Sequence, residues 1–152
     1  MEKKLLITGI PGMGKTTMGE YLAQHYSFIH WDVEKENRID ELLLSKSGNI
    51  VLTWGFVPKD DNIEIIEKLR DRGFDLIWFD GDREAAKREF IERDSKLEKE
   101  NFNSQLQLLE KQLQRIEDSD VIKRLKPRII NTFDKNHMFK NMEDIIDEIL
   151  NI

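Results

Sequence analysis

Residues 9–17, GIPGMGKTT, are of the types from which a protein can build a phosphate site. Three of the chain's 8 glycines fall between positions 9 and 14, and a lysine and two threonines follow them directly. The spacing from Gly9 to Thr16 fits G-x-x-x-x-G-K-[ST] without a mismatch. Such a turn lets backbone N–H groups converge on an anion, and the helix that follows adds its dipole. The stretch therefore predicts a site for nucleotide phosphates.

Each side chain of this loop has a defined task in that chemistry. Lys15 can reach the β- and γ-phosphates as a point charge, and the Thr16 hydroxyl can ligate Mg²⁺. A glycine-rich turn that binds nothing is the alternative, and the motif alone does not separate kinases from ATPases or GTPases. We expect the nucleotide to contact the following residues of the loop: Gly9, Gly12, Met13, Gly14, Lys15, Thr16 and Thr17.

Two carboxylates follow apolar runs and are candidates for catalysis and metal binding. Asp32 ends SFIHWD, where it can accept the proton of a substrate hydroxyl or hold Mg²⁺ through water. Asp80 ends FDLIWFD and resembles a Walker B carboxylate. Capping for Asp32 and turning of the chain for Asp80 are the alternatives. The sequence thus predicts a metal set of Thr16, Asp32 and Asp80. His30 shares a strand face with Asp32 and is a candidate for substrate binding, or a hydrogen-bonded structural histidine.

A stretch of mixed charge follows the second carboxylate. Within it, Arg88 and Arg93 can stabilise charge on a transferring phosphoryl group or stack on adenine. For most of these charges, a solvated helix face is the alternative. Apolar residues at 102, 106, 109, 113 and 116 then form an amphipathic seam. The spacing favours a helical lid, at about 83–120, that packs back onto its own domain rather than a coiled-coil dimer.

The elements that must position these residues alternate between short apolar runs and amphipathic stretches. This alternation predicts an α/β fold, with a parallel sheet between helical layers and ligands at the carboxyl ends of the strands. Asp61 and Glu64 have capping-box spacing at the start of the third helix, and Gly73 stops it. We expect strands at 4–9, 27–32, 49–54, 74–80 and 127–133, and helices at 15–25, 36–46, 61–72, from 83 into the lid, and 141–151.

Length and composition set the remaining bounds. With 152 residues, the chain fits one domain, 1–152, that can bury a core. The net charge of −6 argues against broad binding to nucleic acid, although a polynucleotide end is compatible as a substrate. The absence of cysteine excludes disulfides and thiol nucleophiles. No apolar run approaches the roughly 20 residues of a membrane span, so we expect a cytoplasmic protein. We further expect a monomer or homodimer that acts on a small-molecule acceptor.

Taken in order, the motifs resemble those of the small P-loop metabolite kinases, in particular gluconokinase- and shikimate-kinase-like proteins. GIPGMGKTT looks like their phosphate loop. FIHWDVE looks like the segment in which they carry an aspartate pair separated by one residue, where Asp32 matches the second aspartate and His30 replaces the first. LIWFDGDREAAKREFIER is similar to their strand and arginine-bearing helix, matching Arg88 and Arg93. NFNSQLQLLEKQLQRIE is similar to a gluconokinase lid segment.

The resemblance implies a three-layer αβα fold with a five-stranded parallel core and a helical lid. It further implies ATP and Mg²⁺ as donor and metal, an alcohol or sugar acid as acceptor, and contact of Asn131 and Thr132 with the base. The chain departs from the family in its short segment 33–48 and in TWGFVPK, which lacks a glycine-rich shikimate contact. The candidates for acceptor binding are His30, Arg38, Trp54 and Lys59. The alternative for Arg38 is a solvated helix face, and the alternative for Trp54 is a position in the core.

Three functions fit these residues. The first is an ATP-dependent kinase that acts on a small metabolite such as a sugar acid. The second is a nucleoside, nucleotide or polynucleotide-end kinase, which differs only in its acceptor pocket. The third is a nucleotide-binding regulatory or switch protein with little turnover, for which the seam at 102–116 would be a partner surface. A GTPase is disfavoured, because NTFDKNH does not match the guanine motif N-K-x-D.

Overall fold

The computed structural model describes most of the chain. The described residues are 2–9, 14–33, 48–55, 60–81, 84, 87–88, 99–118, 120–136 and 138–150. Five predicted site residues lie outside these ranges: Gly12, Met13, Arg38, Lys59 and Arg93. The predicted helix at 36–46 and much of the predicted lid at 83–98 also lie outside them.

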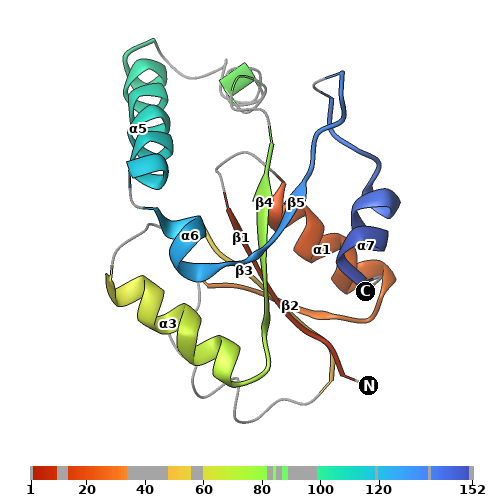
Figure 1. Cartoon of the computed structure of the whole chain (residues 1–152). Helices are drawn as coiled ribbons and strands as arrows, with labels where there is room; N and C mark the ends of the chain where they lie inside the picture. Colours follow the sequence, from red (N-terminus) through yellow and green to blue (C-terminus); the bar gives the residue numbers. More distant parts are fainter. Residues whose placement is uncertain are drawn as a thin grey trace.

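A five-stranded sheet forms the centre of the molecule (Figure 1). Every neighbouring pair of strands is parallel, which confirms the predicted α/β fold. The order β2-β3-β1-β4-β5 puts β1 in the middle, so that the phosphate loop after β1 lies at the centre of the sheet's carboxyl edge. The strands are β1 (Lys4–Gly9), β2 (Ile29–Asp32), β3 (Ile50–Thr53), β4 (Asp75–Asp80) and β5 (Arg128–Asn131).

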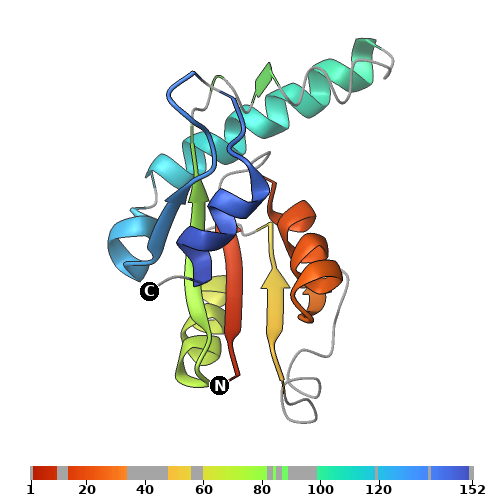
Figure 2. The same cartoon turned by 90° about the vertical axis from the view of Figure 1, so that its right-hand side faces the viewer.

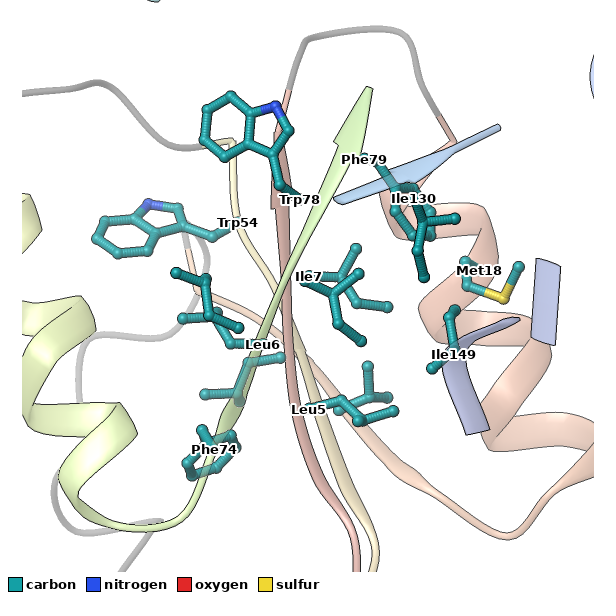
Figure 3. Packing of buried hydrophobic residues seen from close by; sticks show 14 of the residues in the cluster. Leu5, Leu6, Ile7, Met18, Trp54, Phe74, Trp78, Phe79, Ile130 and Ile149 are labelled. Atoms are coloured by element: carbon teal, nitrogen blue, oxygen red, sulfur yellow. The ribbon is translucent and has the colours of Figure 1, made fainter. Parts of the chain in front are cut away.

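Helices cover both faces of this sheet. The helices are α1 (Lys15–His25), α3 (Asp60–Asp71), α5 (Lys99–Asp118), α6 (Val121–Leu125) and α7 (Met142–Leu150). α1 and α7 lie against one face and α3 against the other (Figures 1 and 3). Because both faces are covered, the inner strands read as continuous apolar runs; in β4, the side chains from Leu76 to Phe79 are all at most 2% exposed.

The core is divided by the sheet into two halves. Figure 3 shows Leu5 and Ile7 on the side of α1 and α7, together with Met18 and Ile149. Leu6 lies on the opposite side, among large side chains that also come from β4 and the end of β3. This alternation follows the period of two along a strand, and it decides which helix each residue at the carboxyl edge faces.

The long helix α5 lies beyond the carboxyl ends of the strands (Figure 2). Leu109, Leu113 and Ile116 are buried and belong to the core cluster, so these three members of the predicted seam pack within the chain. Lys87 also reaches Glu110 of α5, with 4.0 Å between Nζ and Oε1. Whether α5 moves as a lid stays a prediction. Among the described helices, none is both long and apolar enough to cross a bilayer.

Several element boundaries shift by one or two residues for local reasons. The predicted strand at 27–32 begins only at Ile29, because Ser27 has a positive φ of 60°. The stop after α3 is confirmed: Gly73 has φ 94°, and its N–H and that of Phe74 donate to the carbonyls of Arg70 and Leu69. These two bonds are a Schellman motif, which needs the left-handed conformation that glycine adopts without strain.

Candidate active site

The phosphate loop is anchored at both ends by glycines in conformations that other residues avoid. Gly9 ends β1 with φ 133°, and a Cβ there would lie 2.2 Å from the carbonyl oxygen of Phe79. Gly14 precedes α1 with φ 86° and ψ 24°, and its carbonyl accepts the N–H of Met18 at 3.0 Å. The close approach to β4 and the left-handed entry to α1 thus explain two of the glycines in the motif.

The start of α1 is suited to an anion. Its first turn carries no acidic residue, and its N-cap residue, Gly14, has no side chain that could cap it. The N–H groups of the first turn and the positive end of the helix dipole are therefore suited to binding a phosphate. Thr16 and Thr17 are exposed there, and the Lys15 ammonium donates back to the Gly9 carbonyl across 3.4 Å. The structure thus brings together every described residue of the predicted loop.

Asp32 lies at the same edge of the sheet, two strands away from the phosphate loop. In the strand register it sits beside Thr53 of β3, and Thr53 sits beside Ile7 of β1. Side chains in register on parallel strands share a face, and Ile7 faces α1 (Figure 3). The half-buried carboxylate of Asp32 therefore lies on the face that α1 covers.

His30 lies one pleat below Asp32 and contacts the neighbouring strand. Its Nε2 is 2.7 Å from the hydroxyl oxygen of Thr53. The ring occupies space that is left by Gly19 of α1, where a Cβ would lie 2.5 Å from Nε2. The alternative of a hydrogen-bonded histidine is thus realised, and contact between His30 and an acceptor stays a prediction. Sequence reasoning missed Thr53 and Gly19; the glycine inside a helix was the available signal, since it costs about 1 kcal/mol relative to alanine.

Asp80 contributes to the turn that follows β4. Its Oδ1 accepts the N–H of Gly81 at 2.7 Å, and its carbonyl accepts the N–H of Thr132 at 3.1 Å. Asn131 lies beside Asp80 in the register, and its side-chain oxygen accepts the N–H of Phe133 at 2.9 Å. These bonds support the turn-forming role of Asp80, and its role as a metal ligand stays a prediction.

Metal binding by carboxylates alone finds no support in the described part of the chain. No group of three or more His, Asp or Glu side chains there could hold an ion. Mg²⁺, however, is commonly held by one or two protein oxygens together with substrate phosphates and water. The exposed hydroxyl of Thr16 and the half-buried carboxylate of Asp32 are oxygen donors of that kind.

A cavity of about 240 Å³ opens beside the phosphate loop. Gly14, Thr17 and Met18 line it from the start of α1, and Phe79 lines it from the end of β4. The remaining wall is the segment from Phe139 into α7. Of the residues predicted to contact the base, Thr132 is fully buried, and its carbonyl accepts the N–H of Lys140, which lines the cavity. Sequence reasoning did not foresee this cavity.

A carboxylate on α7 ties that helix to α1. Glu143 accepts the hydroxyl of Tyr21 at Oε1, 2.6 Å away, and the hydroxyl of Tyr26 at Oε2, 2.5 Å away. The two hydrogen bonds lower the pKa of Glu143, and the bond to the carboxylate raises the pKa of Tyr26 to about 12. Because Met142 beside Glu143 lines the cavity, this bridge also fixes one wall of it.

The remaining described candidates, Trp54 for the acceptor and Arg88 for the phosphoryl group, lie on different elements. Trp54 is only 7% exposed and belongs to the core on the side of α3 (Figure 3). Its carbonyl accepts the Thr8 hydroxyl at 3.0 Å. Arg88 is exposed on the helical residues after β4. Their contacts with an acceptor or with phosphate stay predictions, as do those of Arg38, Lys59 and Arg93, which lie outside the described residues.

Comparison with known proteins identifies the fold. The chain has a TM-score of 0.61 with a gluconokinase from Sinorhizobium meliloti 1021, at 14% identity, covering 97% of this chain and 89% of that one. With a shikimate kinase from Bacteroides thetaiotaomicron the TM-score is 0.56 at 19% identity, covering 99% of both chains. With a shikimate kinase from Aquifex aeolicus the TM-score is 0.51 at 19% identity, covering 99% of this chain and 94% of that one. The chain therefore has the fold of the P-loop small-molecule kinases, which confirms the predicted resemblance.

The similarity in sequence is narrower than the similarity in fold. A stretch of 72 residues, 45% of this chain, is 33% identical to an adenylate kinase from Caldicellulosiruptor bescii. The match spans 33% of that adenylate kinase, so the chain matches about a third of its length. No protein-family profile matches the chain.

Proposed function

We propose that the protein is an ATP-dependent kinase that transfers the γ-phosphoryl group to a hydroxyl of a small metabolite, such as a sugar acid. The observation that carries this proposal is the arrangement at the carboxyl edge of the sheet. A phosphate loop follows the central strand and leads into a helix whose N-cap is a glycine, and the Asp32 carboxylate lies two strands away on the face covered by the same helix. The kinase fold of the structural neighbours agrees with it.

In this proposal the start of α1 binds the donor's phosphates. Backbone N–H groups and the Lys15 ammonium neutralise the β- and γ-phosphates, and the Thr16 hydroxyl with Asp32 or Asp80 would hold Mg²⁺. When bound, Mg²⁺ supplies positive charge that offsets the charge of the transferring group. Asn131, at the end of β5, and Thr132 after it remain the residues that we expect to contact the base.

Asp32 serves as the general base for the acceptor. It takes the proton of the acceptor hydroxyl, while that oxygen forms a bond to the γ-phosphorus and the bond to the β–γ bridging oxygen breaks, releasing ADP. Arg88 and Arg93 stabilise the charge on the transferring group. The candidates for acceptor binding remain His30, Arg38, Trp54 and Lys59. His30 would position Thr53 through the hydrogen bond between them.

A nucleoside or nucleotide acceptor is the second candidate. The stretch that is 33% identical to an adenylate kinase favours it specifically. A regulatory nucleotide-binding protein with little turnover is the candidate from another class. Nucleotide-dependent dimerisation without ADP release, followed by light scattering, would support that third function.

The experiment measures ADP release from Mg-ATP with and without acceptor pools of sugar acids, polyols, nucleosides, nucleotides and a 5′-hydroxyl oligonucleotide. The Lys15→Ala variant is the control, because it lacks the cation at the phosphate site. We expect the sugar-acid pool to raise ADP release in the intact protein alone. Stimulation by nucleosides or nucleotides would favour the second candidate. Tight binding of ATP without stimulation of ADP release by any pool would overturn the proposal that the protein is a kinase.

A further inference from the structure

We propose that the cavity beside the phosphate loop holds the donor's base by shape and stacking, and that the protein therefore accepts ATP and GTP with similar affinity. The inference rests on the proposed function, because it concerns the same donor site. Gly14 and Thr17 belong both to the start of α1 and to the cavity wall. A nucleotide whose phosphates lie on that helix start thus has its base within reach of the cavity.

The size of the cavity fits a base rather than a larger group. At about 240 Å³ it is smaller than the roughly 300–1,000 Å³ of pockets that enclose drug-sized ligands. The phosphates would lie outside it, against the N–H groups of α1. A two-ring base fills such a space better than a one-ring base does, so the fit favours purines.

The described side chains that line the cavity offer little that could distinguish adenine from guanine. Its walls are apolar where Met18, Phe79 and Phe139 line it. Lys140 is paired elsewhere, with its Nζ 3.4 Å from a carboxylate oxygen of Glu148. The hydroxyl of Thr17 both donates and accepts, so it can meet either base. Adenine presents an amino donor at the position where guanine presents a carbonyl acceptor. Only a protein group that donates but does not accept a hydrogen bond, or the reverse, can tell the two bases apart there.

The described backbone N–H groups of the loop after β5 are largely committed to bonds within the chain. The N–H groups of Asp134 and Lys140 donate to the carbonyls of Met138 and Thr132, at 2.7 and 2.8 Å. The N–H groups of Asn136 and Met138 both donate to one side-chain oxygen of Asp134. The N–H groups of Thr132 and Phe133 are likewise engaged, as described above. Six donors of this described segment are thus already used and do not read the base.

Stacking on an aromatic ring is tolerant of the base. Phe139 stacks on Phe133, with ring centroids 4.3 Å apart, and is 39% exposed, so it is held in place and still presents surface. Every base has a π-face, which makes stacking a poor discriminator between the two purines. Sites that read a polar group by hydrogen bonding reject the wrong ligand by about 10⁴–10⁵, whereas apolar pockets discriminate far less.

The test measures displacement of a fluorescent ADP analogue from the protein by ATP, GTP, CTP, UTP and tripolyphosphate. We expect the affinities for ATP and GTP to agree within about tenfold and both pyrimidines to bind at least about tenfold more weakly. Phe139→Ala should weaken ATP and GTP by the same factor and leave tripolyphosphate unchanged. The matched control is Met138→Ala, because Met138 is the preceding residue, is 64% exposed and does not line the cavity.

The outcomes separate this inference from the proposed function. A preference for ATP over GTP beyond tenfold, or equal binding of CTP and ATP, would overturn base selection by shape while leaving the kinase intact. An unequal effect of Phe139→Ala on the two purines would do the same. Equal binding of both purines without phosphorylation of any acceptor would support the inference and contradict the kinase. The ratio in the unmodified protein remains decisive if Phe139→Ala does not fold.

Discussion

Alanine at position 19 should destabilise this protein, although the same substitution stabilises most helices. Replacing a glycine inside a helix by alanine usually raises the free energy of unfolding by about 0.5–1 kcal/mol, because the unfolded chain loses conformational freedom. Here the new Cβ would lie 2.5 Å from Nε2 and 2.6 Å from Cδ2 of His30, and 2.8 Å from Cγ2 of Thr53. Such overpacking costs about 1–3 kcal/mol, and loss of the His30–Thr53 hydrogen bond costs about 0.5–1.5 kcal/mol more.

The net expectation is a loss of about 2 kcal/mol in the free energy of unfolding, which lowers Tm by about 4–8 °C for a chain of this length. Urea denaturation of Gly19→Ala, with the exposed α1 substitution Glu20→Ala as control, measures the loss. In the double variant Gly19→Ala/His30→Ala, the ring that causes the clash is absent, so the two effects should not add. A Gly19→Ala protein as stable as the parent would refute the packing of His30 against α1.

Substitutions at three further positions, Gly9, Gly73 and Glu143, test other contacts. Gly9→Ala should cost about 3 kcal/mol or more in stability, because the Cβ meets the Phe79 carbonyl at 2.2 Å in addition to the strain of a positive φ. Gly73 also has a positive φ, of 94°, but a Cβ there would meet nothing within 4 Å, so Gly73→Ala should cost only the strain. The pKa of Glu143 is lowered in the folded protein, so its contribution to stability is present above its ordinary pKa and is lost as the pH falls through the lowered value. The pKa of Tyr26 is raised, so its hydrogen bond to Glu143 is lost as the pH rises through about 12. Glu143→Gln should therefore flatten the pH dependence of Tm at both ends, and an unchanged Tm profile would contradict the bridge.

The fold was predictable because its signals are local. Short apolar runs bounded by turn residues predicted all five strands, and the continuous apolar runs of β1 and β4 follow from their burial on both faces of the sheet. The phosphate loop was predictable for the same reason, since its residues are contiguous and their spacing is fixed by the chemistry. Boundaries slipped where a single backbone conformation decided them, as at Ser27.

The contacts around the site were not predictable, because they join residues that are distant in sequence. Thr53 meets His30 across 23 positions, and Glu143 meets Tyr21 across 122. Nothing in the neighbouring residues of either partner encodes such a pairing. The cavity likewise arises where three elements meet, so it depends on the packing of α1 and α7 against β4 rather than on any one stretch of the chain.

The central claim is that this chain transfers a phosphoryl group with Asp32 as the base. Mass spectrometry of the acceptor pool after incubation with Mg-ATP tests it most directly, with ADP quantified in the same samples. We expect one phosphorylated acceptor for each ADP released, and a loss of about 10²–10⁴ in rate for Asp32→Asn while displacement of the ADP analogue is unchanged. ADP release without a phosphorylated acceptor, or an unchanged rate in Asp32→Asn, would contradict the account.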